Sequence, residues 1–135
     1  MSGRIIKKIE EDILRFFDNS FDELTGKLLP LIKKIKEVER EFTGVGAYIS
    51  FINKDKPRVD KELANKRFGG DIFIVSKEFM HDVPISIVFD KDGVLDYIEL
   101  EMGMKDTKYP KEYRIEIKPV NVIKGKEVTT TTYSP

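Results

Sequence analysis

The fold of this chain is decided by the stretch Phe89-Asp90-Lys91-Asp92-Gly93-Val94-Leu95-Asp96-Tyr97-Ile98-Glu99-Leu100. One interpretation is a calcium loop, because Asp90, Asp92, Gly93, Leu95 and Glu99 match positions three, five, six, eight and twelve of an EF-hand. The other is a β-hairpin, in which two apolar strands flank the polar turn over residues 90–93. The choice decides whether the densest acidic part of the chain is an ion site or a surface.

The residues upstream favour the hairpin. Position one of the calcium loop would be Val88, whose side chain carries no oxygen ligand. An EF-hand also needs a helix on each side, whereas residues 85–89 follow Pro84 and are rich in β-branched side chains. We therefore expect strands over residues 85–89 and 94–102, and no calcium site.

The N-terminal part of the chain has helical periodicity. Between residues 4 and 18 the apolar side chains recur at three- and four-residue intervals, which predicts an amphipathic helix; they are Ile6, Ile9, Ile13, Phe16 and Phe17. Ser20 and Glu23 form a capping-box pattern that can start a second helix. Pro30 disfavours a continuous helix there, so we expect a kink or a new helix over residues 29–37.

The rest of the chain has the pattern of strands. We expect strands over residues 38–42, 47–52, 71–75 and 113–118, and an edge strand or extended end over residues 128–133. The run over residues 71–75 is apolar throughout, which predicts a central strand buried on both faces. Residues 53–68 are a charged surface loop with room for one helical turn.

These elements predict one α+β domain over residues 1–135. Residues 1–37 are helical, and residues 38–135 form a mostly antiparallel sheet of about five or six strands around the loop at 53–68. The amphipathic helices should pack on one face of this sheet. Short connections between strands favour a meander.

Composition excludes several kinds of partner and chemistry. The 24 basic and 24 acidic residues cancel, so no overall field favours nucleic acid or an anionic membrane. The absence of cysteine excludes disulfides and thiolate nucleophiles. No segment has the roughly 20 apolar residues of a membrane span, and residues 1–12 lack the apolar core of a signal peptide. We expect a soluble, cytoplasmic protein with no nucleic-acid or membrane partner.

Negative charge is concentrated in the hairpin region. Residues 76–102 carry seven carboxylates against two lysines, for a local charge of minus five. Glu99 and Glu101 lie two residues apart, so a strand places both on one face beside Tyr97. We predict that this face binds a protein partner, through Asp90, Asp92, Asp96, Tyr97, Glu99 and Glu101.

The same carboxylates allow a catalytic alternative. A small metal-dependent hydrolase could hold a divalent ion with Asp96, Glu99 and Glu101, with His81, the only histidine, assisting. No arrangement of nucleophile, base and orienting group is evident in the sequence. The segment Gly44-Val45-Gly46 lacks the third glycine of a dinucleotide fingerprint. We therefore assign no catalytic residue, no metal and no cofactor, and favour binding over catalysis.

Three segments together resemble a known kind of protein. They are Thr43-Gly44-Val45-Gly46-Ala47-Tyr48-Ile49-Ser50-Phe51, Gly70-Asp71-Ile72-Phe73 and Asp92-Gly93-Val94-Leu95-Asp96-Tyr97-Ile98-Glu99, followed by Tyr109-Pro110. Small bacterial α+β proteins, some of an immunity-protein type, show a similar order. The resemblance implies a protein-binding role, such as inhibition of a toxin, and carries no catalytic residues. A homodimeric accessory protein that pairs through an exposed strand edge remains a further alternative.

Overall fold

A computed structural model describes residues 4–35, 37–43, 46–52, 60–101, 109–118 and 131–133. In this part of the chain, helices pack on one face of an antiparallel sheet, which confirms the predicted α+β class. The helices are α1 (Lys8–Ser20) and α2 (Leu29–Lys34), and a 3₁₀ turn, η1, spans Lys61–Leu63. The strands are β1 (Arg4–Ile5), β2 (Glu37–Phe42), β3 (Ala47–Ile52), β4 (Arg67–Val75), β5 (Val83–Phe89), β6 (Leu95–Leu100), β7 (Arg114–Ile117) and β8 (Thr131–Tyr133).

The eight strands lie in the order β1-β2-β3-β6-β5-β4-β7-β8, and every neighbouring pair is antiparallel. The edge strands β1 and β8 have only two and three residues, so the six longer strands account for the five or six we expected. The hairpin of β5 and β6 around residues 90–93 is confirmed. A simple meander is wrong, because β3 pairs with β6 and β4 pairs with β7.

The N-terminal helix begins later than its apolar pattern indicated. Arg4 and Ile5 pair with Val38 and Glu37 as strand β1, and α1 starts at Lys8. The backbone N–H of Lys7 donates to the Glu10 carboxylate at 2.9 Å, which satisfies a donor just before the helix. Ile6 packs on the core, but it does so from the linker between β1 and α1 and is not part of the helix.

The second helix is the short one predicted after Pro30, but Ser20 does not cap it. Ser20 is the last residue of α1, and its hydroxyl donates to the carbonyl of Phe16 at 2.6 Å. The buried carboxylate of Asp18 accepts instead from the N–H groups of Gly26, Leu28 and Leu29, at 2.9–3.1 Å. Turns over residues 22–27 separate the two helices, so residues 1–37 are less helical than expected, and Glu37 already belongs to β2.

Strand β4 differs from the prediction in length and burial. It begins at Arg67, and Gly69 and Gly70 lie inside it at a β-bulge, where the register with β5 shifts between Gly69 and Ile72. Gly69 has φ +120°, and a Cβ there would lie 2.2 Å from the carbonyl oxygen of Ile85. Burial on both faces is wrong: Ile72 and Ile74 are buried, whereas Phe73, between them, is partly exposed. The strand is interior to the sheet, and the described helices α1 and α2 cover one side of it.

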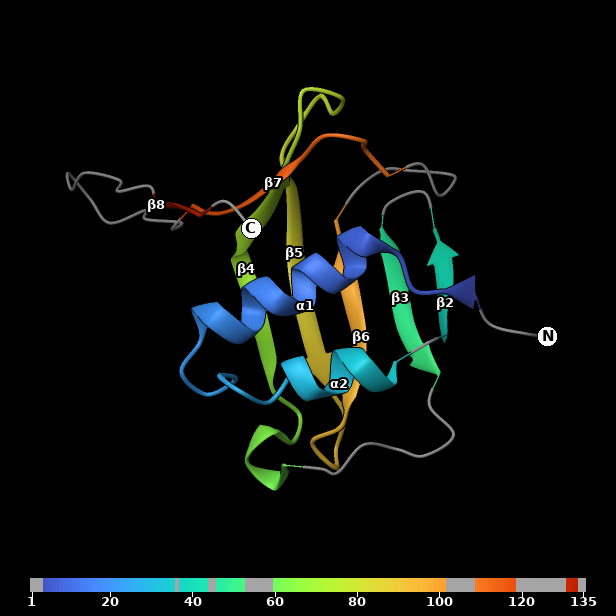
Figure 1. The fold of residues 1–135 in the computed structure, drawn as a ribbon, viewed down its shortest axis with the longest axis vertical. Coiled ribbons are helices and arrows are strands. Elements are labelled where there is room, and N and C mark those ends of the chain that lie inside the picture. Colours follow the sequence, from blue (N-terminus) through green and yellow to red (C-terminus); the bar gives the residue numbers. More distant parts are fainter. Residues whose placement is uncertain are drawn as a thin grey trace.

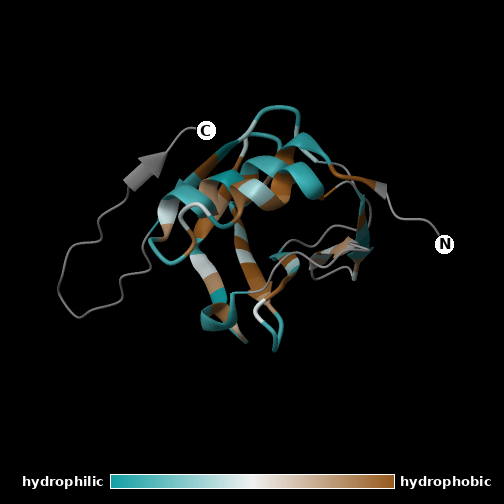
Figure 2. Cartoon of the chain, turned by 60° about the horizontal axis from the view of Figure 1, so that its bottom comes forward, coloured by the Kyte–Doolittle hydropathy of each residue, from teal (hydrophilic) through white to brown (hydrophobic). Residues whose placement is uncertain are grey.

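The core lies between the helices and the sheet. Figure 2 shows the apolar residues of the two layers facing each other. The fully buried side chains include Phe17 from α1, Ile49 from β3 and Ile98 from β6. In the described residues, no helix has the length and apolar character needed to cross a membrane. Residues 53–59 of the loop predicted over residues 53–68, and residues 119–130 of the tail before β8, lie outside the described residues.

Candidate protein-binding face

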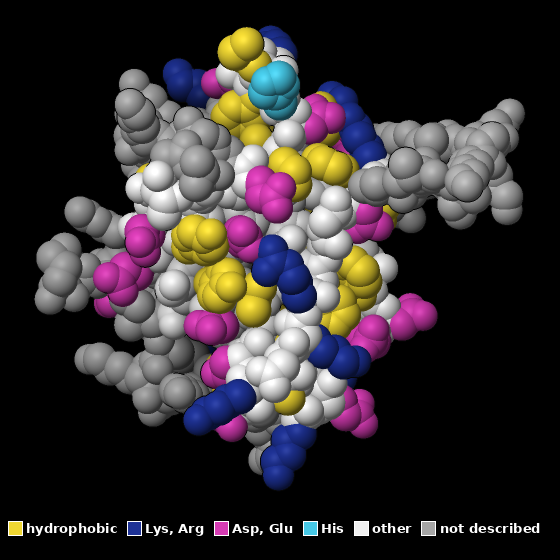
Figure 3. Space-filling model, turned by 180° about the vertical axis from the view of Figure 1, so that it is seen from behind, with side chains coloured by type: hydrophobic (Ala, Val, Ile, Leu, Met, Phe, Trp, Pro, Cys, Tyr) yellow, Lys and Arg dark blue, Asp and Glu magenta, His cyan; other side chains and the backbone are white. Residues whose placement is uncertain are grey.

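The face of the sheet opposite the helices is the candidate site. Strand register identifies its residues, because side chains directly opposite each other in neighbouring strands lie on the same face. One row across the sheet is Glu41, Tyr48, Glu99 and Ser86, and the next is Glu39, Ser50, Tyr97 and Val88. We call these eight residues the outer face. Figure 3 shows this side, where hydrophobic side chains gather among acidic ones.

Strand β2 supplies acidic residues that our sequence analysis missed. Glu37, Glu39 and Glu41 alternate with Val38, Arg40 and Phe42, and all three glutamates are exposed. Glu39 and Glu41 lie opposite Ser50 and Tyr48 in the register. The alternation of glutamate with Val38, Arg40 and Phe42 was visible in the sequence, but only the pairing of β3 with β6 brings these glutamates to the same face as Tyr97 and Glu99.

Two tyrosines form the centre of the outer face. The rings of Tyr48 and Tyr97 lie edge to face with centroids 5.7 Å apart. Both tyrosines are partly exposed, so each can present part of its side chain to a partner. Tyrosine in this setting is a common anchor for a protein partner, because it buries a large area at low cost in conformational entropy.

One basic residue neutralises part of the acidic charge. The guanidinium of Arg67, on β4, forms an ion pair with the carboxylate of Glu99, and this hydrogen bond raises the pKa of Arg67 above its ordinary value. The Arg67 side chain is 51% exposed, whereas that of Glu99 is 17% exposed. Glu99 is therefore less free to pair with a partner than the glutamates of β2.

The six predicted binding residues do not all lie together. Tyr97 and Glu99 belong to the outer face, and exposed Glu101 follows the end of β6, with its N–H donating to Pro84 at 3.0 Å. Asp96 is exposed at the start of β6, at the opposite end of the strand.

Asp90 has a structural role in the hairpin turn. Its carboxylate accepts from the N–H groups of Asp92 and Val94, at 2.8 and 3.0 Å. These bonds fix the turn locally, as aspartate does in many tight turns. Asp92 is exposed in the same turn. Asp90 therefore stabilises the hairpin, and we do not assign it to the outer face. The candidate face is centred on β3 and β6 and extends to β2, whereas the sequence had indicated the turn.

The described residues contain no group of three or more histidine, aspartate or glutamate side chains placed to hold a metal ion. His81 is exposed in the connection between β4 and β5, next to Met80, which is 93% exposed. The geometry thus lends no support to a hydrolase that gathers Asp96, Glu99 and Glu101 around one ion.

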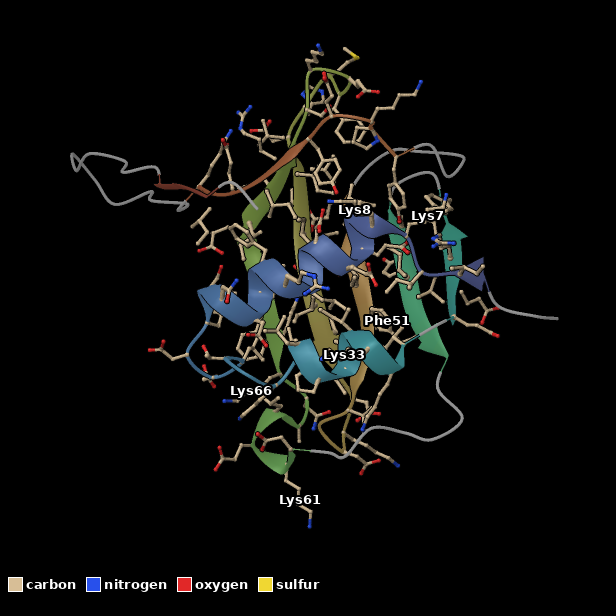
Figure 4. All side chains as sticks on the ribbon, viewed as in Figure 1. Lys7, Lys8, Lys33, Phe51, Lys61 and Lys66 are labelled. Carbon is tan, nitrogen blue, oxygen red and sulfur yellow. The ribbon has the colours of Figure 1, made fainter. Side chains whose placement is uncertain are left out.

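A buried polar network lies on the other side of the sheet. The carboxylate of Glu10 accepts from Arg40 Nε and Nη2, both at 2.5 Å, and from the Tyr109 hydroxyl at 2.7 Å. Glu10 is fully buried and the Arg40 side chain is 5% exposed. Burial raises the pKa of the Tyr109 hydroxyl above its ordinary value. Figure 4, viewed from the helix side, shows Lys7 at the start of α1, where its ammonium lies 5.5 Å from the centre of the Tyr109 ring.

This network joins α1 to β2 and to the segment before β7. Its polar atoms are turned towards one another inside the protein, so we assign it to the fold and not to a site.

Comparisons with known protein families, with curated proteins and with solved structures found no match for this chain. Functional inference therefore rests on the geometry of the outer face.

Proposed function

We propose that this is a non-catalytic binding protein whose outer face meets a basic surface on a protein partner. The observation that carries the proposal is the register that places Glu39, Glu41 and Glu99 beside the Tyr48–Tyr97 pair, on the sheet face opposite α1 and α2. Aromatic anchors within a polar rim are typical of protein interfaces, and complementary charge speeds association and sets specificity.

The kind of partner follows from the resemblance and the charge together. An immunity-type protein of a bacterial cytoplasm would use such a face to cover a basic surface of its toxin. The carboxylates of β2 support this proposal because no ion pair with another described residue engages Glu39 or Glu41. Both remain available for lysine or arginine side chains of a partner.

The same glutamates disfavour the homodimer alternative. Strand β1 pairs with β2 only at Glu37 and Val38. No other described strand pairs with this edge of β2, so the remainder of the edge could pair with a strand of a second copy. In an antiparallel self-pairing centred on Arg40, Glu39 of one copy would face Glu41 of the other. Like charges directly opposite each other destabilise a sheet, and natural edges use such charges to prevent pairing.

Charge reversal on β2 tests the proposal. The partner is first isolated by affinity purification from the source cells and then titrated with the purified protein. The double variant Glu39→Lys/Glu41→Lys should weaken binding at least tenfold at low salt, mainly through slower association. The control variant Asp22→Lys/Glu62→Lys changes the net charge equally, at exposed positions outside the strands, and should bind like the original protein. Equal affinity of both variants would overturn the acidic-face proposal.

A further inference from the structure

A cavity lies between α2, η1 and the turn of the β5–β6 hairpin. Its volume is about 360 Å³, and it is partly open to solvent. The walls are mostly apolar: Leu28, Leu63, Phe89 and Leu95 line it, and each is at most 5% exposed. We call it the α2 cavity. It lies on the helix side of the sheet and shares no residue with the outer face.

The α2 cavity is a depression at the surface whose floor is formed in part by core side chains. Water against apolar walls has few hydrogen-bond partners. An apolar group that entered the α2 cavity would displace such water and cover these side chains. The volume is at the small end of the range for ligand sites, and fits a ligand of about ten non-hydrogen atoms.

The polar rim selects the charge of the ligand. Lys27, Asp60 and Lys61 line the same cavity, which gives two cations and one anion. The Asp60 carboxylate is already engaged, since it pairs with the Lys27 ammonium and accepts from the N–H of Glu62 at 3.0 Å. The Lys61 ammonium forms no hydrogen bond or ion pair with any other described residue.

Lys61 is labelled in Figure 4, where its side chain extends from η1 into solvent at the end of the molecule. The lysine side chain is a flexible four-carbon chain, so rotation about its bonds can bring this ammonium to an anion held at the rim. Among the described residues that line the cavity, Lys61 is therefore the charged one without an ion-pair partner.

We propose that the α2 cavity binds a small amphipathic monocarboxylate, with its hydrocarbon part against Leu28, Leu63 and Phe89 and its carboxylate at Lys27 and Lys61. The proposal is independent of the outer face, and the two tests can fail separately.

A homologous series of ligands tests the apolar part. Hexanoate, heptanoate and octanoate are titrated while the methyl resonances of the leucines and valines are followed by NMR. Affinity should rise about fourfold for each added methylene until the cavity is full. The largest shifts should occur at Leu28, Leu63 and Val94. Shifts scattered over the protein, or none that saturate below the concentration at which octanoate forms micelles, would overturn the proposal.

The charge is tested with octanamide, which has the same length but no charge. Octanoate should bind about threefold more tightly than octanamide, and Lys61→Gln should remove this difference. Lys33→Gln is the matched control: Lys33 is exposed on α2 but does not line the cavity, so its loss should preserve the difference (Figure 4). Equal binding of octanoate and octanamide to the original protein, or an equal effect of the two lysine variants, would show that no anion site exists.

Discussion

Replacement of Glu10 by glutamine should be strongly destabilising, although it changes only one atom of the side chain. All four groups that Glu10 contacts are donors: the N–H of Lys7, Nε and Nη2 of Arg40, and the hydroxyl of Tyr109. A glutamine has one oxygen and one NH₂ group, so in either orientation its NH₂ faces donors. The Arg40 charge would then be buried without a counter-charge.

The magnitude follows from the burial of the pair. Glu10 is 0% exposed and the Arg40 side chain 5%, so water cannot replace the lost carboxylate. Loss of one partner from a buried ion pair costs about 3–5 kcal/mol. For a domain of this size, about 4 kcal/mol corresponds to a fall in Tm on the order of 12 °C. The variant should still fold, since small domains have about 5–15 kcal/mol of stability.

Urea unfolding followed by circular dichroism measures this effect directly. Glu11→Gln, at the next position of α1, is the control and should change the free energy of unfolding by less than about 0.5 kcal/mol. The double variant Glu10→Leu/Arg40→Met removes both charges together and should be more stable than Glu10→Gln, because apolar replacement of a whole buried pair is often neutral. A loss below about 1 kcal/mol in Glu10→Gln would refute the reasoning.

Two further predictions concern backbone strain and alkaline pH. Gly69→Ala should lower the free energy of unfolding by about 3 kcal/mol, because the new Cβ would overlap the Ile85 carbonyl. Gly70→Ala has a positive φ of +92° but open space around the new Cβ, so it should cost only about 1–2 kcal/mol. Equal losses of stability in thermal melts of the two variants would contradict the bulge geometry. Burial raises the pKa of both Tyr109 and Tyr113 in the folded protein, whereas unfolded tyrosines lose their protons near pH 10. The folded state therefore retains more protons above pH 10, and stability should fall as pH rises, with Tyr109 contributing at most about 1.4 kcal/mol per pH unit. Tyr109→Phe should reduce this slope in urea melts between pH 10 and 11, and an unchanged slope would disprove the assignment.

The hairpin and the α+β class could be predicted because their signals are local. The turn over residues 90–93 is fixed by Asp90, whose carboxylate binds N–H groups two and four residues later. The apolar spacing of α1 likewise depends on neighbours within one or two turns. Pattern alone could not place the start of α1, since Ile6 contributes to the core from an extended segment.

The features that sequence analysis missed depend on long-range pairing. Arg40 and Tyr109 reach Glu10 from positions 30 and 99 residues away, and no local pattern marks them as partners. The pairing of β3 with β6, which assembles the outer face, required the order of strands across the whole sheet. Sequence analysis could therefore identify the acidic cluster within residues 76–102, but it could not show that Glu39 and Glu41 of β2 lie on the same face.

The position of the two proposed sites on opposite sides of the sheet makes them separable by experiment. Glu39 and Glu41 lie opposite Ser50 and Tyr48 on the side without helices, whereas Phe89 and Leu95 line the α2 cavity among the core side chains. Solvent-exposed charges that lie farther apart than the screening length, about 8 Å at physiological salt, interact only weakly. Charge reversal at β2 that also changed octanoate affinity would therefore require a change in the sheet itself, and the stability of Glu39→Lys/Glu41→Lys would reveal such a change before any binding measurement.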